Sequence, residues 1–323
     1  MGLFQTLETP TIREDRALVV HAYGKRFSAI QEGRVVFFEK LAQYAQREGL
    51  PCYLVDQSEL ASGILQESDH INIIFGPSHA DGPNLFHADE SYIVGFWYLD
   101  PKGVFWNSSL ADAEFDPSTI DAKEATYFFN GVTGFMLREN YSKRTQTLRL
   151  NAPLDKAKAV IFAQDIENYM TKVHYLTLDQ MIETAAQATD ETVYVKPHPL
   201  YDAHARDALA ARCAEFKNVV LSDASVHDLI AASDVVLSQN SAAGFEAFMQ
   251  KKPVITCGAS DYHHGSLVAR SSDALKDAIA AAPDIVKSFP YEKYFYWFLH
   301  DHMLEVQKPD FAKRAWARLS KRG

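Results

Sequence analysis

Residues that could act as a nucleophile or a general base gather in a short acidic segment near the middle of the chain. Residues 164–168 (QDIEN) follow an apolar run and carry two carboxylates and two amides. If that run is a strand, Asp165 or Glu167 lies at its tip, where a carboxylate could attack a substrate or remove a proton. The alternative is the N-terminus of a helix with its usual acidic residues, and the pattern favours neither.

A histidine bracketed by prolines is the second candidate, at residues 196–199 (KPHP). Neither proline can donate a ladder hydrogen bond, so the preceding strand must end there. Proline also biases the residue before it toward extended geometry, which holds His198 on a stiff loop. Such a histidine could donate to a phosphate oxygen or protonate a leaving group. Lys196 could add a positive charge. The alternative for both residues is a solvated polar turn.

A turn of small residues is the third candidate. Residues 238–247 (SQNSAAGFEA) run from a strand into a helix, and such a turn offers an anion free N–H groups, hydroxyls and the positive end of the helix dipole. Gly244 would allow close approach of a ligand. Ordinary N-capping by Asn240 or Ser241 is the alternative. Capping leaves Glu246 unexplained, because it lies too far along the helix for a capping box. Glu246 could reach a ribose hydroxyl or be a solvated helix residue.

Two adjacent histidines mark the fourth candidate. Residues 258–265 (GASDYHHG) follow another apolar run, and we interpret them as a nucleotide-facing loop. A metal site at His263 and His264 is the alternative. It is disfavoured because adjacent histidines rarely point the same way and because the H-x-x-x-H spacing of a helical site is absent.

The first half of the chain holds a smaller set of candidates. A metal cluster of His79, Asp81, His87 and Asp89 can be drawn, but its spacing matches no zinc signature. We favour the wall of an acceptor-binding cleft, because aromatic faces and amides suit sugars. That wall would contain His79, His87, Glu90, Asn107, Trp97 and Trp106. Core packing is the alternative for the two tryptophans.

Strands and helices alternate through the second half of the chain. The predicted strands are 157–163, 192–196, 218–221, 234–238 and 253–257, and the predicted helices are 178–188, 203–216, 226–232, 241–250 and 272–282. This alternation indicates βαβ units around a parallel sheet. Ligands bind beyond the carboxyl ends of such strands, which is where the four polar segments of the second half lie.

The first half alternates less regularly. Strands are predicted at 16–22, 52–55 and 71–75, a polar loop at 23–26, and a helix at 35–47 that ends before the C-cap residue Gly49. Residues 78–107 are expected to be a long irregular stretch, which in a compact domain implies a function. A domain boundary is predicted near residues 149–153. The aromatic segment 291–300 is predicted as a helix that packs across both domains.

Composition narrows the class of protein. The chain has 323 residues, 47% of them hydrophobic, and a formal net charge of −10. The length favours two domains, and the acidic balance argues against general nucleic-acid binding. Three well-separated cysteines argue against a disulfide framework and favour a reducing compartment. No transmembrane span or signal peptide is expected.

The motifs together resemble a known family. KPHP, then S-x-N-S-x-x-G-F-E-A, then K-P-V-I-x-x-G is similar to the bacterial capsule polysaccharide biosynthesis proteins, which include Kdo transferases. A first-half stretch that starts at Glu90 and includes Gly103 and residues 107–109 (NSS) is also similar. The resemblance covers about half of the chain, from Glu90 to Tyr262.

The resemblance implies an α/β fold of two Rossmann-like domains, GT-B-like, with a cleft between them. It implies an acceptor-side domain at 1–152, a nucleotide-sugar-binding domain at 153–290, and a helical segment at 291–323 that crosses back. It further implies a glycosyltransferase of capsular polysaccharide synthesis that uses CMP-Kdo as donor and a glycan or glycolipid as acceptor. No metal or other cofactor is expected, and the location would be cytoplasmic, at the inner face of the membrane.

The resemblance also suggests roles for individual residues. His198 would contact the donor phosphate, and Glu246 would reach the ribose. The phosphate or cytidine side would be bound by Ser238, Asn240 and Ser241, with Gln164, Lys196 and Gly244 completing the donor site. Asp165 is the predicted catalytic carboxylate, with Glu167 in reserve, because the acid here directly follows Gln164 and the family's spacing differs. Retention and inversion both stay open.

Two other functions compete with a sugar transferase. One is a non-catalytic nucleotide-sugar or glycan-binding scaffold of a polysaccharide assembly complex, which the altered acid spacing at 164–168 would favour. The other is a metal-dependent hydrolase that uses the first-half histidines and acids. Residues 291–298 and the basic residues between 313 and 322 could touch lipid headgroups. A packed helix followed by a solvated basic tail is the alternative.

Overall fold

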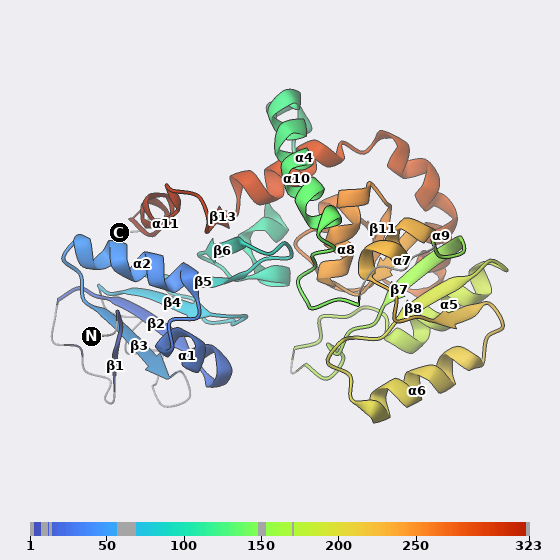
Figure 1. The fold of residues 1–323 in the computed structure, drawn as a ribbon, viewed down its shortest axis with the longest axis horizontal. Coiled ribbons are helices and arrows are strands. Elements are labelled where there is room, and N and C mark those ends of the chain that lie inside the picture. The colour runs from blue at the N-terminus through green and yellow to red at the C-terminus, as the bar shows by residue number, and fades with distance from the viewer. Residues whose placement is uncertain are drawn as a thin grey trace. The chain divides into compact units, whose positions relative to one another are not determined.

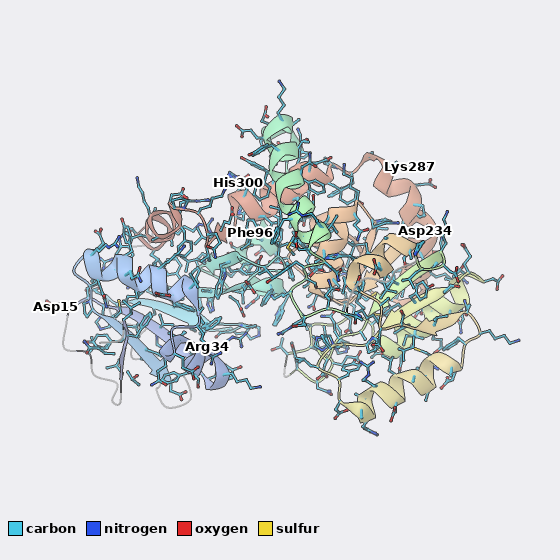
Figure 2. All side chains as sticks on the ribbon, viewed as in Figure 1. Asp15, Arg34, Phe96, Asp234, Lys287 and His300 are labelled. Atoms are coloured by element: carbon cyan, nitrogen blue, oxygen red, sulfur yellow. The ribbon has the colours of Figure 1, made fainter. Side chains whose placement is uncertain are left out.

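The fold is that of a computed structural model, which describes residues 3–7, 12, 15–56, 69–147, 153–169 and 171–320. The chain forms two compact units, each built around its own sheet (Figure 1). The first unit comprises residues 1–91, 95–113 and 299–323, and the second comprises 92–94 and 114–298. Charged side chains such as Arg34 and Asp234 lie at the surface (Figure 2). No helix in the described ranges is long and apolar enough to cross a bilayer.

The second unit is built on a fully parallel sheet of six strands. Its strands are β7 (Ala157–Phe162), β8 (Val193–Lys196), β9 (Val219–Leu221), β10 (Ser233–Ser238), β11 (Val254–Thr256) and β12 (Leu267–Val268). The spatial order is β12-β11-β10-β7-β8-β9, so β7 is central and the chain proceeds outward from it first on one side and then on the other. This is the strand order of a Rossmann fold, and its switch point lies between β7 and β10.

Helices cover both faces of this sheet. They are α5 (Leu178–Ala188), α6 (Ala203–Ala214), α7 (Val226–Ala232), α8 (Ala242–Ala247) and α9 (Ser272–Ile285). Helices α5 and α9 pack on each other and on the strand residues Ile161, Val195 and Leu237, all fully buried. Helices α7 and α8 lie against β10. Thr177 begins α5 with a complete capping box, so the sequence defines that helix start locally.

An aromatic cluster joins three further elements to α8. Helix α4 (Ala122–Arg138) packs on α10 (Tyr291–Phe295) through Phe129 and Phe295, whose ring centroids are 5.3 Å apart. Phe245 of α8 lies 4.6 Å from Phe298, at the start of a π-helical turn (Tyr296–Asp301). Tyr92 stacks on Phe245 at 5.3 Å. These contacts hold α8, which lies within the polar segment 238–247, through Phe245.

The first unit has a mixed sheet of seven strands. They are β1 (Gln5–Thr6), β2 (Leu18–Ala22), β3 (Cys52–Asp56), β4 (Ile71–Phe75), β5 (Leu85–Glu90), β6 (Phe96–Asp100) and β13 (Leu304–Glu305). Their order is β1-β3-β2-β4-β5-β6-β13, with β6 antiparallel to both of its neighbours and the rest parallel. The switch point of this sheet lies between β2 and β4.

In the described part of the first unit, the helices that accompany the sheet are α1 (Gly24–Gln31), α2 (Val36–Arg47) and α11 (Phe311–Leu319). Fully buried Phe37 and Phe38 of α2 and Phe311 of α11 form one core with the inward residues of β2, β4 and β6. The end of α2 follows the predicted signal, because Gly49 has φ of +80°, a conformation that glycine adopts without strain. The last helix of the chain therefore completes the core of the first unit.

The five strands predicted for the second sheet are confirmed, and α5 and α7 match to the residue. The edge strand β12 carries no prediction. The irregular stretch predicted at 78–107 is wrong, because β5 and β6 lie within it. Histidine and aspartate inside β5 suggested a loop, but each of these side chains has a partner. His87 Nε2 lies 3.0 Å from the Ala80 carbonyl oxygen, and Asp89 forms an ion pair with Arg26 at 2.8 Å. Pairing of this kind offsets the free-energy cost of removing polar side chains from water.

Other differences concern elements and boundaries. The segment predicted as a loop at 23–26 starts helix α1 instead, and α4 carries no prediction. Helix α11 lies within the helical segment predicted at 291–323. The helix predicted at 291–300 is α10 followed by the π-helical turn. Residues 148–152, which include most of the predicted domain boundary, lie outside the described residues. By packing, residues 114–147 group with the second sheet, and residues 299–323 rather than 291–323 group with the first.

Replacement of a core residue in β7 tests its central place. Ile161 is fully buried between helices and neighbouring strands, so Ile161→Ala should lower the free energy of unfolding by about 2–5 kcal/mol. The matched control is Val220→Ala in the outer strand β9, where the side chain is 43% exposed. That change should stay within about 0.5 kcal/mol. Urea unfolding followed by circular dichroism measures both, and equal effects would contradict this placement of β7.

Candidate functional site

A pair of amide side chains joins two strand tips at the switch point of the second sheet. Gln164 follows β7 and Asn240 follows β10. Gln164 Nε2 donates to Asn240 Oδ1, and the Asn240 backbone N–H donates to Gln164 Oε1, both at 2.9 Å. Asn240 Nδ2 also donates to the carbonyl oxygen of Ala259, after β11. Three of the predicted polar segments are thereby linked where a Rossmann fold binds its ligand.

His198 and Asp165 lie close to this amide pair. Tyr201, three residues after His198, donates its hydroxyl to the Gln164 carbonyl at 3.0 Å. His198 is half-buried, and its pKa is lowered by burial and by the Arg144 guanidinium, while the Asp165 carboxylate raises it. Burial and the Asp165 charge also raise the pKa of Tyr201 to about 12. His198 is therefore a neutral imidazole at pH 7, and the Asp165 carboxylate would stabilise its charged form.

The two candidate catalytic acids have different surroundings. Asp165 is exposed, and its Oδ1 accepts one long hydrogen bond, 3.3 Å from Asn168 Nδ2. Glu167 Oε1 accepts from the Leu178 backbone N–H at 2.6 Å and from Gln239 Nε2 at 3.0 Å. Glu167 thus ties the start of α5 to the tip of β10, whereas Asp165 keeps an accessible carboxylate.

The turn from β10 into α8 is tightly filled. Ser241 caps the helix, with its Oγ accepting from the Ala243 N–H at 3.2 Å. The Tyr262 hydroxyl donates to the Ser241 carbonyl at 2.9 Å and lies 3.4 Å from Ser238 Oγ. A Cβ on Gly244 would come within 2.7 Å of both Ser238 Oγ and the Tyr262 hydroxyl. The glycine is thus needed for packing within the turn.

Glu246, predicted to reach a ribose, is completely buried beneath this turn. Its Oε1 accepts from Ser142 Oγ at 2.8 Å and from the Lys143 backbone N–H at 3.1 Å. Burial raises the pKa of its carboxyl to about 7. Within the described residues, Oε2 has no hydrogen-bond partner. Its visible partners therefore all belong to the segment between α4 and the second sheet.

The remaining candidates of the second unit are held by the chain itself. Lys196 Nζ donates to the carbonyl oxygens of Asp223 and Ala224, at 3.2 and 2.6 Å. Burial lowers the pKa of Lys196. In the loop after β11, His263 Nδ1 lies 2.9 Å from the Ser260 carbonyl oxygen, and the rings of His263 and His264 are 4.0 Å apart. No group of three His, Cys, Asp or Glu side chains suited to a metal occurs in the described parts of either unit.

In the first unit, the predicted acceptor-side residues surround the loop after β4. Asn107 Nδ2 donates to the Ser78 carbonyl at 2.8 Å, and buried His87 binds the Ala80 carbonyl. His79 is exposed on the same loop, at the switch point of this sheet. Glu90 ends β5, and its Oε1 accepts from the Gly95 N–H at 3.0 Å. Three of the four side chains thus shape the loops around His79.

The two tryptophans differ. Trp97 is 9% exposed and stacks on Phe37 at 4.7 Å, so it belongs to the core. Trp106 is half-buried beside Phe105, with 6.4 Å between ring centroids. A role in an acceptor site therefore suits Trp106 better than Trp97.

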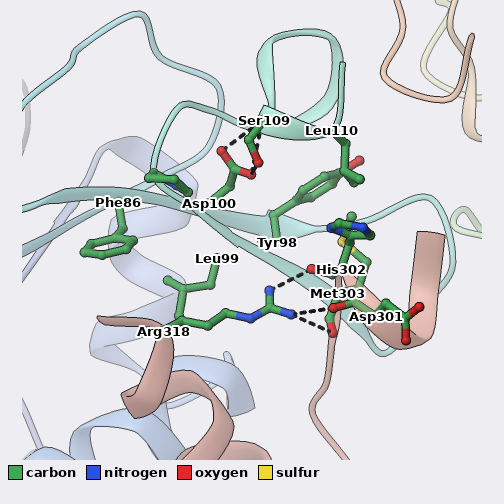
Figure 3. A pocket seen from close by; sticks show the side chains of 11 residues that line it. Phe86, Tyr98, Leu99, Asp100, Ser109, Leu110, Asp301, His302, Met303 and Arg318 are labelled. Carbon is green, nitrogen blue, oxygen red and sulfur yellow. Dashed lines mark hydrogen bonds between the residues drawn. The ribbon is translucent and has the colours of Figure 1, made fainter. Parts of the chain in front are cut away.

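A hollow of about 320 Å³ lies elsewhere in the first unit, beside the start of β5 rather than its carboxyl end (Figure 3). Its charged residues are paired within the chain. Asp100 accepts from the N–H groups of Gly103 and Ser109, and Arg318 donates to the carbonyl oxygens of residues 301–303. Burial lowers the pKa of Arg318 to about 10. Arg314 similarly donates to His300, so neither arginine belongs to a solvated tail.

Two residues near His198 were missed by the sequence analysis. Arg144 lies outside every motif, and its only signal was a Lys-Arg pair after an aromatic helix. Tyr201 lies two residues after the KPHP motif, and its aromatic side chain near a proline-bracketed histidine was the available signal. Their positions depend on chain segments that meet only in the folded unit.

Comparison with known proteins identifies the second unit's relatives. Residues 136–285 match the family model described as "Capsule polysaccharide biosynthesis protein", which confirms the resemblance drawn from the motifs. No protein of curated function matches the chain in sequence.

Solved structures show the fold that this chain shares. Thermosulfurimonas dismutans KpsC, described both as a beta Kdo 2,7 transferase and as a beta Kdo 2,4 transferase, gives a TM-score of 0.51 at 14% identity in each case. Each alignment covers 82% of this chain and 90% of the KpsC chain. A glycosyltransferase from Rickettsia africae is similar at 7% identity and a TM-score of 0.46, covering 96% of this chain and 99% of its own. The likeness to KpsC shows that the chain shares the fold of that protein, and the strand orders above make both of its units Rossmann-like.

The buried carboxyl of Glu246 should make stability depend on pH. Its pKa is about 7 in the folded protein against 4.5 as the ordinary value, so the folded state keeps a proton that the unfolded chain releases. The resulting stabilisation is complete below the lower pKa and is lost as the pH rises through the higher one. The loss is on the order of 3 kcal/mol. Glu246→Gln, which cannot ionise, should escape it.

Urea unfolding at about pH 5 and about pH 8 measures this effect. Relative to wild type, Glu246→Gln should be more stable at the higher pH than at the lower. The control is Glu114→Gln, because Glu114 is exposed and its removal should not alter the pH dependence. Parallel pH profiles for wild type and Glu246→Gln would contradict the buried, protonated carboxyl.

Proposed function

We propose that this chain is a glycosyltransferase of bacterial capsule polysaccharide synthesis. It transfers Kdo from CMP-Kdo to a glycan or glycolipid acceptor at the inner face of the cytoplasmic membrane. The family match over residues 136–285 and the glycosyltransferase-like fold support this proposal. So do the side chains at the strand tips of the second unit, which suit an activated sugar phosphate. The donor would bind to the second unit.

The observation that carries the proposal is the amide pair at the switch point. Gln164 and Asn240 are joined by two hydrogen bonds. Next to them, the charge of Asp165 raises the pKa of His198. The donor phosphate would lie beside His198, and the sugar would face Asp165. Asp165 is an accessible carboxylate and His198 is a neutral imidazole. Enzymes use such a pair to give the roles of acid and base to different side chains.

The reaction requires little beyond these groups. The bond between the anomeric carbon and the phosphate oxygen breaks, and its electron pair stays on the departing CMP. Neutral His198 can donate an N–H to that oxygen as negative charge develops there. In one route Asp165 attacks the anomeric carbon, and the acceptor hydroxyl then loses its proton and displaces the Asp165 carboxylate, which gives retention. In the other route Asp165 takes the proton of the acceptor hydroxyl while the acceptor oxygen attacks the anomeric carbon directly, which gives inversion. Metal independence is part of the proposal and is tested by work in a chelator.

A binding scaffold is the second candidate function. It is favoured by one observation, namely that the Glu167 carboxylate is engaged by Leu178 and Gln239. Asp165 is then the one acid of the 164–168 segment with an accessible carboxylate. A scaffold would bind a nucleotide sugar through the same strand tips but would not need that acid.

Nucleotide preference is the first test. Calorimetric titration with CMP, UDP, GDP and ADP in the presence of a chelator should show selective binding of CMP. His198→Ala should weaken it by about tenfold or more, because a hydrogen bond to a charged group is lost. The control His204→Ala removes an exposed histidine from α6 and should bind as wild type does. Preference for UDP or GDP would refute the CMP-Kdo donor, and no binding of any nucleotide would refute the transferase.

Asp165→Asn separates the enzyme from the scaffold. Loss of a nucleophile or general base should reduce turnover by about 10²–10⁴-fold or more while CMP binding persists. Release of CMP from CMP-Kdo in the presence of acceptor is the measurement. Glu167→Gln serves as the comparison, because its carboxylate accepts bonds from α5 and β10 and the change should affect stability more than chemistry. Unchanged turnover in Asp165→Asn would exclude that residue as the catalytic acid.

A further inference from the structure

A short segment between α4 and the second sheet is fastened to two helices of the second unit. The Tyr141 carbonyl lies 2.6 Å from His227 Nε2, and Gln146 Oε1 accepts from the Val226 N–H at 2.6 Å, both on α7. Between these points, Ser142 and Lys143 bind the buried carboxylate of α8 described above. We call residues 141–147 the anchored segment. Four bonds over so few residues fix its backbone firmly.

Arg144 lies in the middle of the anchored segment without a partner of its own. Its side chain is exposed, and it forms no hydrogen bond or ion pair with the residues that the structure describes. The segment lies beside the tip of β8, because its Gln146 binds α7 and the Ala224 carbonyl just before α7 accepts from Lys196 Nζ at 2.6 Å. In agreement with this placement, the Arg144 charge lowers the pKa of His198. Exposed charges influence each other over roughly 10 Å at physiological salt. The anchored segment therefore brings a free guanidinium to the neighbourhood of His198.

Folding alone does not account for this arrangement. A guanidinium beside an imidazole is repulsive as soon as the imidazole is protonated, and the buried Glu246 carboxyl costs free energy to desolvate. An anion between the guanidinium and the imidazole would accept hydrogen bonds from both groups and would remove that repulsion. Arginine is suited to that anion, because its planar fork binds phosphate oxygens in a bidentate way.

We propose that Arg144 binds the donor phosphate opposite His198, and that Glu246 is a positioning residue that holds Arg144 there through Ser142 and Lys143. This inference rests on the proposed function. In the described structure Glu246 has no exposed surface for a ribose hydroxyl, and its hydrogen bonds all go to the anchored segment. The phosphate gains negative charge as CMP departs. Arg144 therefore stabilises the departing group more than the intact donor, which speeds cleavage.

The experiment compares ligands with and without a phosphate. CMP, cytidine and inorganic phosphate are titrated into wild type, Arg144→Ala and Arg144→Lys. Arg144→Ala should bind CMP about 10- to 100-fold more weakly, the effect of one hydrogen bond between charged groups. Its affinity for cytidine should be unchanged, and Arg144→Lys should recover part of the loss. Arg138→Ala removes the same charge from an exposed site at the end of α4 and should behave as wild type.

A second set of variants tests Glu246. Glu246→Ala removes the acceptor for Ser142 and Lys143, whereas Glu246→Gln keeps a carbonyl oxygen in its place. The alanine variant should lose affinity for CMP but not for cytidine, and the glutamine variant should recover it. If Glu246→Ala does not fold, Ser142→Ala removes one of the two bonds and should give a smaller, equally CMP-specific loss. A merely structural role would reduce the binding of both ligands together.

The outcomes separate this inference from the proposed function. Unchanged CMP affinity in Arg144→Ala, or an equal loss for CMP and cytidine, overturns the role of Arg144. If wild type binds inorganic phosphate through Arg144 but no nucleotide, the anion site stands and the transferase proposal fails. If wild type binds neither phosphate nor any nucleotide, both fail. If wild type prefers another nucleotide, the same comparison is made with its nucleoside, and an Arg144 effect specific to the phosphate supports the inference.

Discussion

The reciprocal amide pair between Gln164 and Asn240 is the interaction on which the rest of the site depends. An amide side chain offers both donors and an acceptor, so it can bind in both directions without carrying charge. Here the Gln164 amide donates to the Asn240 side chain and accepts from the Asn240 backbone N–H, across the switch point between β7 and β10. The Tyr201 hydroxyl binds the carbonyl of the same glutamine. The tips of three strands are therefore hydrogen-bonded to one another through Gln164. The bond from Tyr201 positions the loop that contains His198.

A second constraint comes from the carboxyl groups that accept hydrogen bonds from the chain around that centre. Glu167 and Gln239 tie α5 to β10, and Glu246 ties α8 to the anchored segment. A buried carboxylate is expensive unless it accepts several hydrogen bonds. Each of these carboxylates accepts at least two, so each specifies the relative position of two chain segments. The accessible acid, Asp165, is the exception, and this difference distinguishes a group that can react from groups that hold the frame.

Much of the second unit could be predicted from sequence, because its strands are continuous apolar runs and its helices begin with local signals such as the Thr177 capping box. The polar segments after those runs were recognisable for the same reason. The first unit was harder. Strand β5 alternates buried apolar residues with His87 and Asp89, whose partners lie elsewhere in the chain. Arg144 was missed because its position depends on bonds from α7 and α8, which no local pattern encodes.

The path of the chain has a consequence for its biosynthesis. Helix α11 and strand β13 belong to the first unit, although they follow the whole second unit in sequence. During translation the second sheet is complete while one face of the first still lacks the cover of Phe311, Ala315 and Leu319. The first unit therefore begins to emerge from the ribosome before the second unit but can finish folding only after it. Until α11 emerges, that apolar face is exposed on the nascent chain and is a site where chaperones can bind.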